Sequence, residues 1–125
     1  FGDGSTKFQP VFIDDVSQAI KEIINTKISG KNIYELAGPR IYSYKEFFNH
    51  ISNFLNKTRV LVPVPMGVMK PMINIAEKTP ISPLTSEQLM LFEKDNLAVN
   101  VDKSLENLDI NPQDTLQVLK NIVVN

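Results

Sequence analysis

The chain contains no cysteine and only one histidine among its 125 residues. Without cysteine it has no disulfide, no thiolate nucleophile and no cysteine ligand for zinc, a composition that fits a reducing compartment. A zinc site needs three or four ligands within tetrahedral reach, so His50 alone predicts no metal site. The sequence also lacks a G-x-S-x-G nucleophile elbow, which leaves a Ser-His-Asp hydrolase without support.

A strong net charge and long hydrophobic runs are missing as well. With 13 basic and 14 acidic residues the net charge is -1, so we expect neither nucleic acid nor an anionic membrane surface as a partner. No apolar run approaches the roughly 20 residues that span a bilayer, and nothing resembles a signal peptide. These absences predict a soluble, cytoplasmic chain with no transmembrane segment.

The length and composition that are present suit one domain. At 42% hydrophobic residues, a chain of this size can bury a core, and we expect residues 1–125 to form a single domain. The chain begins at Phe1 rather than at a methionine, so we expect it to be part of a longer protein.

The first elements are predicted to be a strand and a helix on either side of two aspartates. QPVFI (9–13) is a short apolar run typical of a buried strand. Apolar residues from Val16 to Ile24 recur at helical spacing and predict a helix that ends near Gly30. Asp15, with Gln18 three residues on, matches a capping box and is interpreted as the helix N-cap, whereas Asp14 is interpreted as solvated.

The next predicted elements are a second strand and a second capped helix. KNIYELAGP (31–39) has a strand pattern that ends in a Gly-Pro turn. Ser43 and Glu46 match a second capping box before an aromatic-rich helix. RVLVPVP (59–65) is predicted to be extended, because each proline restricts the residue before it to extended geometry.

Helices dominate the remainder of the chain. Residues 66–78 carry apolar residues at helical spacing, although Pro71 should limit or kink a helix there. Thr85 and Gln88 predict a third cap, 97–101 is a candidate strand, and Asn111 with Pro112 should open a final helix. The fold class is therefore α/β, mixed α+β within this chain, with helices dominant and a few short strands.

Two patterns carry weak chemical signals. GDG (2–4) resembles part of a phosphate loop, but it lacks the following glycine and a preceding strand, so a turn is the favoured interpretation. The four methionines could line an adaptable binding surface. Methionines at helical spacing are more often core or interface, and both alternatives stay open here.

Three segments carry a resemblance to a known superfamily: GDGSTKFQPVFIDDVSQAI (2–20), GKNIYELAGPRIYSYKEFFNHI (30–51) and LVPVP (61–65). They closely resemble the C-terminal part of the extended short-chain dehydrogenases/reductases. Within it the chain looks like the atypical branch that holds the nicotinamide-binding accessory subunit of respiratory complex I and its bacterial relatives, often labelled NAD-dependent epimerase/dehydratase or NADH dehydrogenase-like proteins. The PLTSEQLMLFEKDN segment (83–96) shares the resemblance.

The resemblance implies a substrate-side portion of an extended Rossmann-type dehydrogenase whose dinucleotide-binding domain is absent. The family's glycine-rich pyrophosphate turn does not occur here. Its Tyr-x-x-x-Lys is missing too, since Gly38, Glu46 and Phe48 stand four residues beyond the three tyrosines. We therefore expect no catalytic residue and no cofactor-binding residue in this chain, with NAD or NADP bound by the parent protein.

Partners and a cleft also follow from the resemblance. The implied partners are the chain's own N-terminal Rossmann domain and, as alternatives, a respiratory complex at the inner membrane or a second copy of the chain. Phe8 takes the place of the arginine with which sugar-nucleotide enzymes of the superfamily clamp phosphates, which argues against a nucleotide-sugar substrate. Phe8 and Gln9 are candidates for a cleft. We expect Met69, Met72 or Ile73 to be partly exposed and covered by the missing domain or a second copy, the alternative being that all three are core.

Three functions remain open at this point. The first is an accessory or substrate-side domain of an NAD(P)-binding, NADH dehydrogenase (ubiquinone)-like protein that is not catalytic by itself. The second is part of an active epimerase, dehydratase or reductase, which an upstream Tyr-x-x-x-Lys would favour. The third is a non-enzymatic interaction module, which the absence of both upstream motifs would favour.

Overall fold

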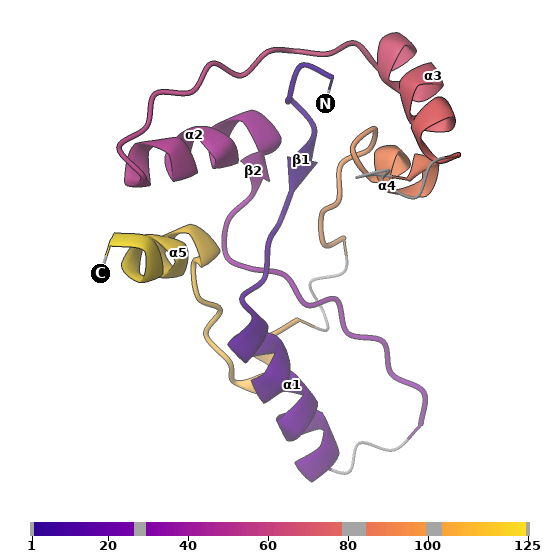
Figure 1. Ribbon diagram of the computed structural model, residues 1–125. Coiled ribbons are helices and arrows are strands. Elements are labelled where there is room, and N and C mark those ends of the chain that lie inside the picture. Colours follow the sequence, from indigo (N-terminus) through magenta and orange to yellow (C-terminus); the bar gives the residue numbers. More distant parts are fainter. Residues whose placement is uncertain (1, 27–29, 79–84, 100–103, 125) are drawn as a thin grey trace. The chain divides into compact units, whose positions relative to one another are not determined.

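The computed structural model describes every residue except 1, 27–29, 79–84, 100–103 and 125 (Figure 1). The chain divides into two compact units, each built from two separate stretches of sequence. Unit 1 contains Phe1–Phe8 and Tyr42–Asn96, and unit 2 contains Gln9–Ile41 and Leu97–Asn125. The described elements, in chain order, are β1 (Lys7–Phe8), α1 (Ile13–Asn25), β2 (Tyr42–Ser43), α2 (Tyr44–Phe54), α3 (Met66–Ala76), α4 (Ser86–Leu91), the 3-10 turn η2 (Glu106–Leu108) and α5 (Thr115–Val124). The predicted helix-dominated α/β character with short strands is confirmed.

An antiparallel pair of very short strands organises unit 1. β1 and β2 pair with Lys7 opposite Ser43 and Phe8 opposite Tyr42. Single bridges join Gly2 to Val64 and Phe8 to Asn96. Aromatic rings pack around this pair, with centroids 4.5 Å apart for Phe8 and Tyr44 and 4.8 Å apart for Tyr44 and Phe92. Such ring pairs stabilise a small core beyond the area that they bury.

The helices of unit 1 begin where the sequence predicts. Ser43 caps α2 and Thr85 caps α4, and both capping boxes are complete. The Ser43 hydroxyl accepts from the Glu46 N–H at 3.2 Å, and the Glu46 carboxylate accepts from the Ser43 N–H at 2.9 Å. α3 continues through Pro71. Because proline has no N–H, the helix lacks the one hydrogen bond that residue 71 would donate to the Gly67 carbonyl.

Unit 2 holds a small aliphatic core against α1. Ala19, Leu105 and Ile110 are buried, and Val11, Leu36 and Leu108 pack against them. Ala19 comes from the inner face of α1, which contacts η2. The core therefore joins residues from the two distant stretches of sequence that make up this unit.

The predicted strands of unit 2 are wrong. Residues 9–12 and 31–41 have no regular strand, and neither do 97–99 within the candidate strand at 97–101, of which 100 and 101 lie outside the described residues. Side chains instead make the links between these segments: the Gln9 amide bonds the Gly38 carbonyl and the Ala98 N–H, and the Glu35 carboxylate bonds the Val99 N–H. Pro10 also cannot donate to a ladder.

Two helix boundaries in unit 2 differ from the prediction as well. α1 ends at Asn25 with Thr26 as its C-cap, before Gly30. α5 begins at Thr115 and not at Pro112. The Asp114 carboxylate accepts from the Leu116 N–H at 3.0 Å, so Asp114 does what was predicted of Asn111.

Candidate functional site

A hollow of about 300 Å³ opens beside the GDG turn in unit 1. Its apolar wall comes from α2 and from the extended segment after it, and its polar wall comes from the turn and the first residues of α2. The lining residues are Gly2, Asp3, Gly4, Tyr44, Lys45, Phe48, Leu61, Val62 and Pro63. Most of the surface that lines the hollow is apolar, so the hollow suits an apolar group better than a nucleotide.

The GDG segment is a turn, and its polar groups are already engaged. Gly2 and Gly4 have φ of 56° and 77°, a region that favours glycine. The Asp3 carboxylate accepts from the Ser5 N–H at 2.9 Å and the Ser5 hydroxyl at 2.6 Å. These two bonds lower the pKa of Asp3 below its ordinary value. The carboxylate acts within the turn and is not a poised general base.

The N-terminus of α2 borders the hollow but offers no anion site. An anion at a helix N-terminus is held by backbone N–H groups that lack a partner. Here the Tyr44 N–H donates to the Thr6 carbonyl at 3.1 Å and the Lys45 N–H to the Gly4 carbonyl at 3.0 Å. The Glu46 N–H donates to the Ser43 hydroxyl. These three N–H groups at the start of α2 are therefore not free to bind the phosphate that a phosphate-loop interpretation of GDG would require.

Tyr44 brings no acid-base chemistry to the hollow. Burial raises the pKa of its hydroxyl above the ordinary value, which keeps the group protonated at neutral pH. The residue four positions on is Phe48, where a catalytic lysine would lower that pKa. Among the described residues, no group of three or more histidine, cysteine, aspartate or glutamate side chains could hold a metal ion. The described lining of the hollow is that of a small, mostly apolar pocket.

Phe8 and Gln9, the two cleft candidates, both have structural partners. Phe8 belongs to the aromatic cluster of unit 1, where its ring also meets Phe47 edge-on at a centroid distance of 5.1 Å. In unit 2 the Gln9 amide donates to the Gly38 carbonyl at 2.8 Å and accepts from the Ala98 N–H at 3.3 Å. Each side chain is half-buried, and their local contacts explain their positions without a ligand.

The Gly-Pro dipeptide at 38–39 belongs to a segment that resembles the superfamily, and the structure gives a physical reason for its glycine, Gly38. A Cβ atom at this position would overlap the Pro10 carbonyl oxygen. Only glycine allows the two backbones to approach so closely. The backbones at Pro10 and Gly38 are therefore in close contact, and this contact fixes the position of the segment that precedes Arg40.

The interpretation of Asp15 as an N-cap is wrong. α1 begins at Ile13, and its N-cap is Phe12, whose side chain makes no capping bond. Asp15 lies in the first turn and is only 1% exposed. Its two carboxylate oxygens accept from the backbone N–H of Gln113 at 2.8 Å and from the Gln113 side-chain amide at 2.9 Å. Asp14 is exposed, as predicted. Asp15 is thus a tertiary anchor, and no residue near it in the sequence signals a partner 98 positions away.

The apolar side chains of α3 divide between buried and exposed. Ile73 is 6% exposed, Met69 is half-buried and Met72 is 59% exposed. Of the three candidates, Ile73 is therefore core, and the remaining two are accessible to different degrees. What covers Met69 and Met72 in a larger assembly stays a prediction.

α1 in unit 2 also exposes apolar residues. Ala19 is buried, but Ile13, Ile20 and Ile24 each remain more than half exposed along one side of the helix. An apolar helix face normally packs against another element. Unit 2 by itself leaves this stripe of α1 uncovered.

None of the described helices is long and apolar enough to cross a membrane.

No protein-family model matches the chain. Two curated proteins are similar to it in sequence. One is the mitochondrial NADH-ubiquinone oxidoreductase 40 kDa subunit of Neurospora crassa, 27% identical over 109 residues, which are 86% of this chain and 29% of that protein. The other is the mitochondrial NADH dehydrogenase (ubiquinone) 1 alpha subcomplex subunit 9 of Arabidopsis thaliana, 32% identical over 101 residues, 76% of this chain and 25% of that protein.

The matches cover most of this chain but little of the relatives. The chain spans less than a third of the length of either curated protein. Both are subunits of respiratory NADH:ubiquinone oxidoreductase, so the predicted family-level resemblance is confirmed.

Proposed function

We propose that this chain, which is similar to these two NADH-ubiquinone oxidoreductase subunits, is the substrate-side, accessory domain of an NAD(P)H-binding, NADH dehydrogenase-like protein of the extended short-chain dehydrogenase/reductase type. The dinucleotide binds to a Rossmann domain in the rest of that protein, and this chain is not catalytic by itself. The match to the 40 kDa subunit over 86% of the chain is the observation that carries the proposal.

The contacts of the motif residues support this role. The segments that resemble the superfamily are used to build the fold: Gly38 packs on the Pro10 carbonyl, Gln9 bridges two backbone groups and Asp15 anchors Gln113. None of these contacts prepares a proton relay or a pyrophosphate cradle. The chain supplies a scaffold rather than chemistry.

The exposed stripe of α1 gives the scaffold a docking face. Ile13, Ile20 and Ile24 would be covered by the dinucleotide-binding domain, since the relatives carry more than twice as much additional chain as this sequence covers. Burying three isoleucines could supply about 4–6 kcal/mol before the entropy of association is subtracted. We further infer a position peripheral to the respiratory membrane, within or beside the complex.

Titration calorimetry tests the division of labour between the two domains. The 125-residue chain should bind neither NADH nor NADPH, and the longer protein that contains it should bind one of them. Micromolar binding to the chain alone would overturn the proposal. Failure of the longer protein to bind either nucleotide would favour a plain interaction module.

A charge placed on α1 tests the docking face. In the longer protein, Ile20→Glu should loosen the contact between the domains and speed proteolysis of the chain between them, because it buries an unpaired carboxylate. Ile122→Glu on α5 is the matched control, since Ile122 is also an exposed helix isoleucine. Equal proteolysis of the two variants would count against α1 as the docking face.

A further inference from the structure

α3 carries two apolar stripes, and unit 1 buries only one. Met69, Ile73 and Ala76 form the inner stripe, and Ile73 is buried, as is Leu89 of α4, the helix that α3 contacts. Val68, Met72 and Ile75 form the outer stripe at the same helical spacing, and all three are exposed. A helix that is apolar on both sides normally has a second apolar neighbour. The outer stripe has none among the described residues of unit 1.

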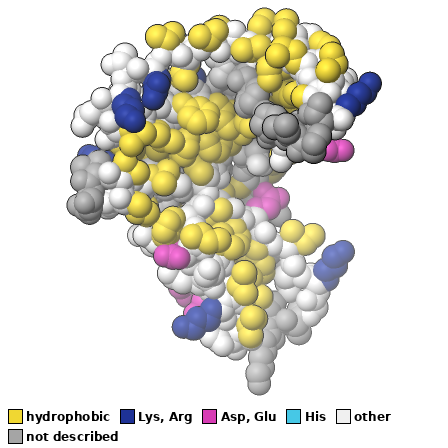
Figure 2. All heavy atoms as spheres, in the orientation of Figure 1, with side chains coloured by type: hydrophobic (Ala, Val, Ile, Leu, Met, Phe, Trp, Pro, Cys, Tyr) yellow, Lys and Arg dark blue, Asp and Glu magenta, His cyan; other side chains and the backbone are white. Residues whose placement is uncertain are grey.

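The extended segment before α3 continues this surface. Val60 is 85% exposed and Val62 72% exposed, and Pro63 and Pro65 follow them. Figure 2 shows hydrophobic side chains gathered over α3 and the segment that leads to it. We call Val60, Val62 and the outer stripe of α3 the apolar band. A surface of this kind on a small unit marks a site of contact.

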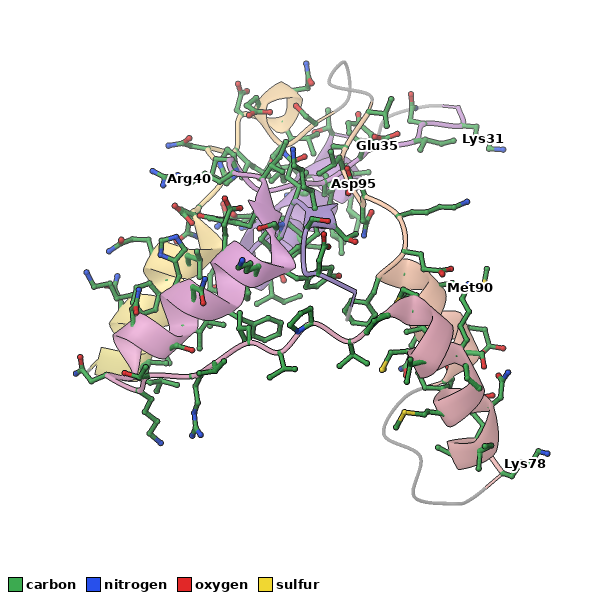
Figure 3. All side chains as sticks on the ribbon, turned by 90° about the horizontal axis from the view of Figure 1, so that it is seen from above. Lys31, Glu35, Arg40, Lys78, Met90 and Asp95 are labelled. Atoms are coloured by element: carbon green, nitrogen blue, oxygen red, sulfur yellow. The ribbon has the colours of Figure 1, made fainter. Side chains whose placement is uncertain are left out.

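Charge is segregated along the apolar band. From Phe47 to Ala76 the sequence has no aspartate or glutamate, although the whole chain has 14. Lys57 and Arg59 precede the band. At the end of α3, Lys78 (Figure 3) follows Glu77, whose carboxylate accepts from the Ser86 hydroxyl at 2.9 Å. Lys70 is the exception within it, because its ammonium pairs with the Glu93 carboxylate at 2.6 Å. The net charge of -1 hides this basic, acid-free stretch.

We propose that the apolar band rests on the surface of a lipid bilayer that contains anionic lipid. Apolar side chains then enter the headgroup boundary, and Lys57 and Arg59 at the start of the band meet lipid phosphates. α3 has 11 residues and is about 16 Å long, so it lies in the interface and does not span it. A second copy packed on the same band would offer Lys57 and Arg59 no aspartate or glutamate from residues 47–76, which disfavours that occupant. This contact does not require the accessory role, and it gives a physical basis for the peripheral membrane position proposed above.

Vesicle flotation of the 125-residue chain tests the proposal directly. The chain should float with vesicles of mixed phosphatidylcholine and phosphatidylglycerol, bind much more weakly to phosphatidylcholine alone, and be released by high salt. Replacing Lys57 and Arg59 together by glutamine should weaken binding about 30-fold, since each basic residue near an anionic surface contributes about 1 kcal/mol. Lys21→Gln with Lys120→Gln, two exposed lysines of unit 2, is the control and should bind like the parent chain.

A matched pair of isoleucine variants tests the apolar part. Ile75→Glu in the apolar band should weaken vesicle binding at least about tenfold. Ile122→Glu on α5 makes the same change at a similarly exposed helix position, 66% against 69% for Ile75, and should leave binding unchanged. Circular dichroism should show that both variants fold.

Several outcomes would overturn the proposal. These are no flotation with either lipid, equal flotation with neutral and anionic vesicles, or equal loss for Ile75→Glu and Ile122→Glu. Absence of flotation together with a concentration-dependent dimer that Ile75→Glu abolishes would assign the band to a second copy. Flotation that is lost when the chain is part of the longer protein would assign the band to the missing domain.

Discussion

Asp15 and Ser43 stand in the same kind of sequence pattern, yet the structure uses them differently. Each is a small polar residue with a glutamine or glutamate three positions later. Ser43 closes a local box with Glu46 and remains accessible at the start of α2. Asp15 lies within the first turn of α1, is buried, and bonds Gln113 from the other end of the chain. The pattern therefore specifies a polar bond near a helix start, but not whether its partner is local.

The difference sets how much each residue should stabilise the fold. A local cap at a solvated helix start can be replaced in part by water. The Asp15 carboxylate cannot, because it is only 1% exposed and its two hydrogen bonds join α1 to Gln113. The predictions below use this contrast between local and tertiary bonds.

The largest effect is expected at Asp15. Asp15→Ala should lower the free energy of unfolding by about 2–3 kcal/mol, because two hydrogen bonds to a charged acceptor are lost. Asp14→Ala, at the exposed neighbouring position, should change it by less than about 0.5 kcal/mol. Urea midpoints of the two variants decide this, and equal losses would place Asp15 outside the fold's interior.

A pair of glycine variants sharpens the contrast by backbone contact. Gly38→Ala should destabilise by about 1–3 kcal/mol, because the new Cβ overlaps the Pro10 carbonyl oxygen. Gly67→Ala should stabilise by roughly 0.5–1 kcal/mol, because Gly67 lies in α3 with open space where its Cβ would go. Thermal unfolding of both variants should shift in opposite directions. Destabilisation by both would show that α3 does not tolerate a side chain there.

The smallest effect is expected at the caps. Ser43→Ala should lower the free energy of unfolding by about 0.5–2 kcal/mol, and Thr85→Ala by a similar or smaller amount. The bonds from the Ser43 N–H and hydroxyl lower the pKa of Glu46 below 4.5. This part of the stability is therefore present above pH 4.5 and is lost as the pH falls through the lowered pKa. The difference between the parent chain and Ser43→Ala should shrink in acid, and a difference that grew in acid would contradict the Glu46 contribution.

The sequence predicts best what is decided within a few residues. The boxes at Ser43 and Thr85 depend on groups three positions apart, and both were located correctly. α3 was also placed within two residues of its end, since helical spacing of apolar residues is a local signal. The two cleft candidates, Phe8 and Gln9, were named from a resemblance, and their contacts in the aromatic cluster and with Gly38 depend on the fold.

The structural features that cannot be predicted from the sequence depend on residues far apart in the chain. The predicted strands at 9–13 and 31–39 have the right composition, but side chains such as Gln9 and Glu35 make the bonds that a ladder would make. Nothing near Asp15 in the chain points to Gln113. The sequence of α3 also does not show which of its two apolar faces is buried. Both faces are apolar, and only the packing of α3 on α4 makes one of them buried.

The interleaving of the two units has a consequence for the order in which the protein can form. Residues 9–41 leave the ribosome early, but Leu105, Ile110 and Gln113, which complete their core and bond Asp15, are made only near the end. Until then α1 exposes Ala19 and the Asp15 carboxylate without their partners, a state that favours aggregation or chaperone binding. Unit 1 needs only residues up to 96, so it can be complete while unit 2 is still half-made. A circular permutant that begins at residue 97 would leave only residues 1–8 and a connecting linker between the two stretches of unit 2, and would shorten that wait.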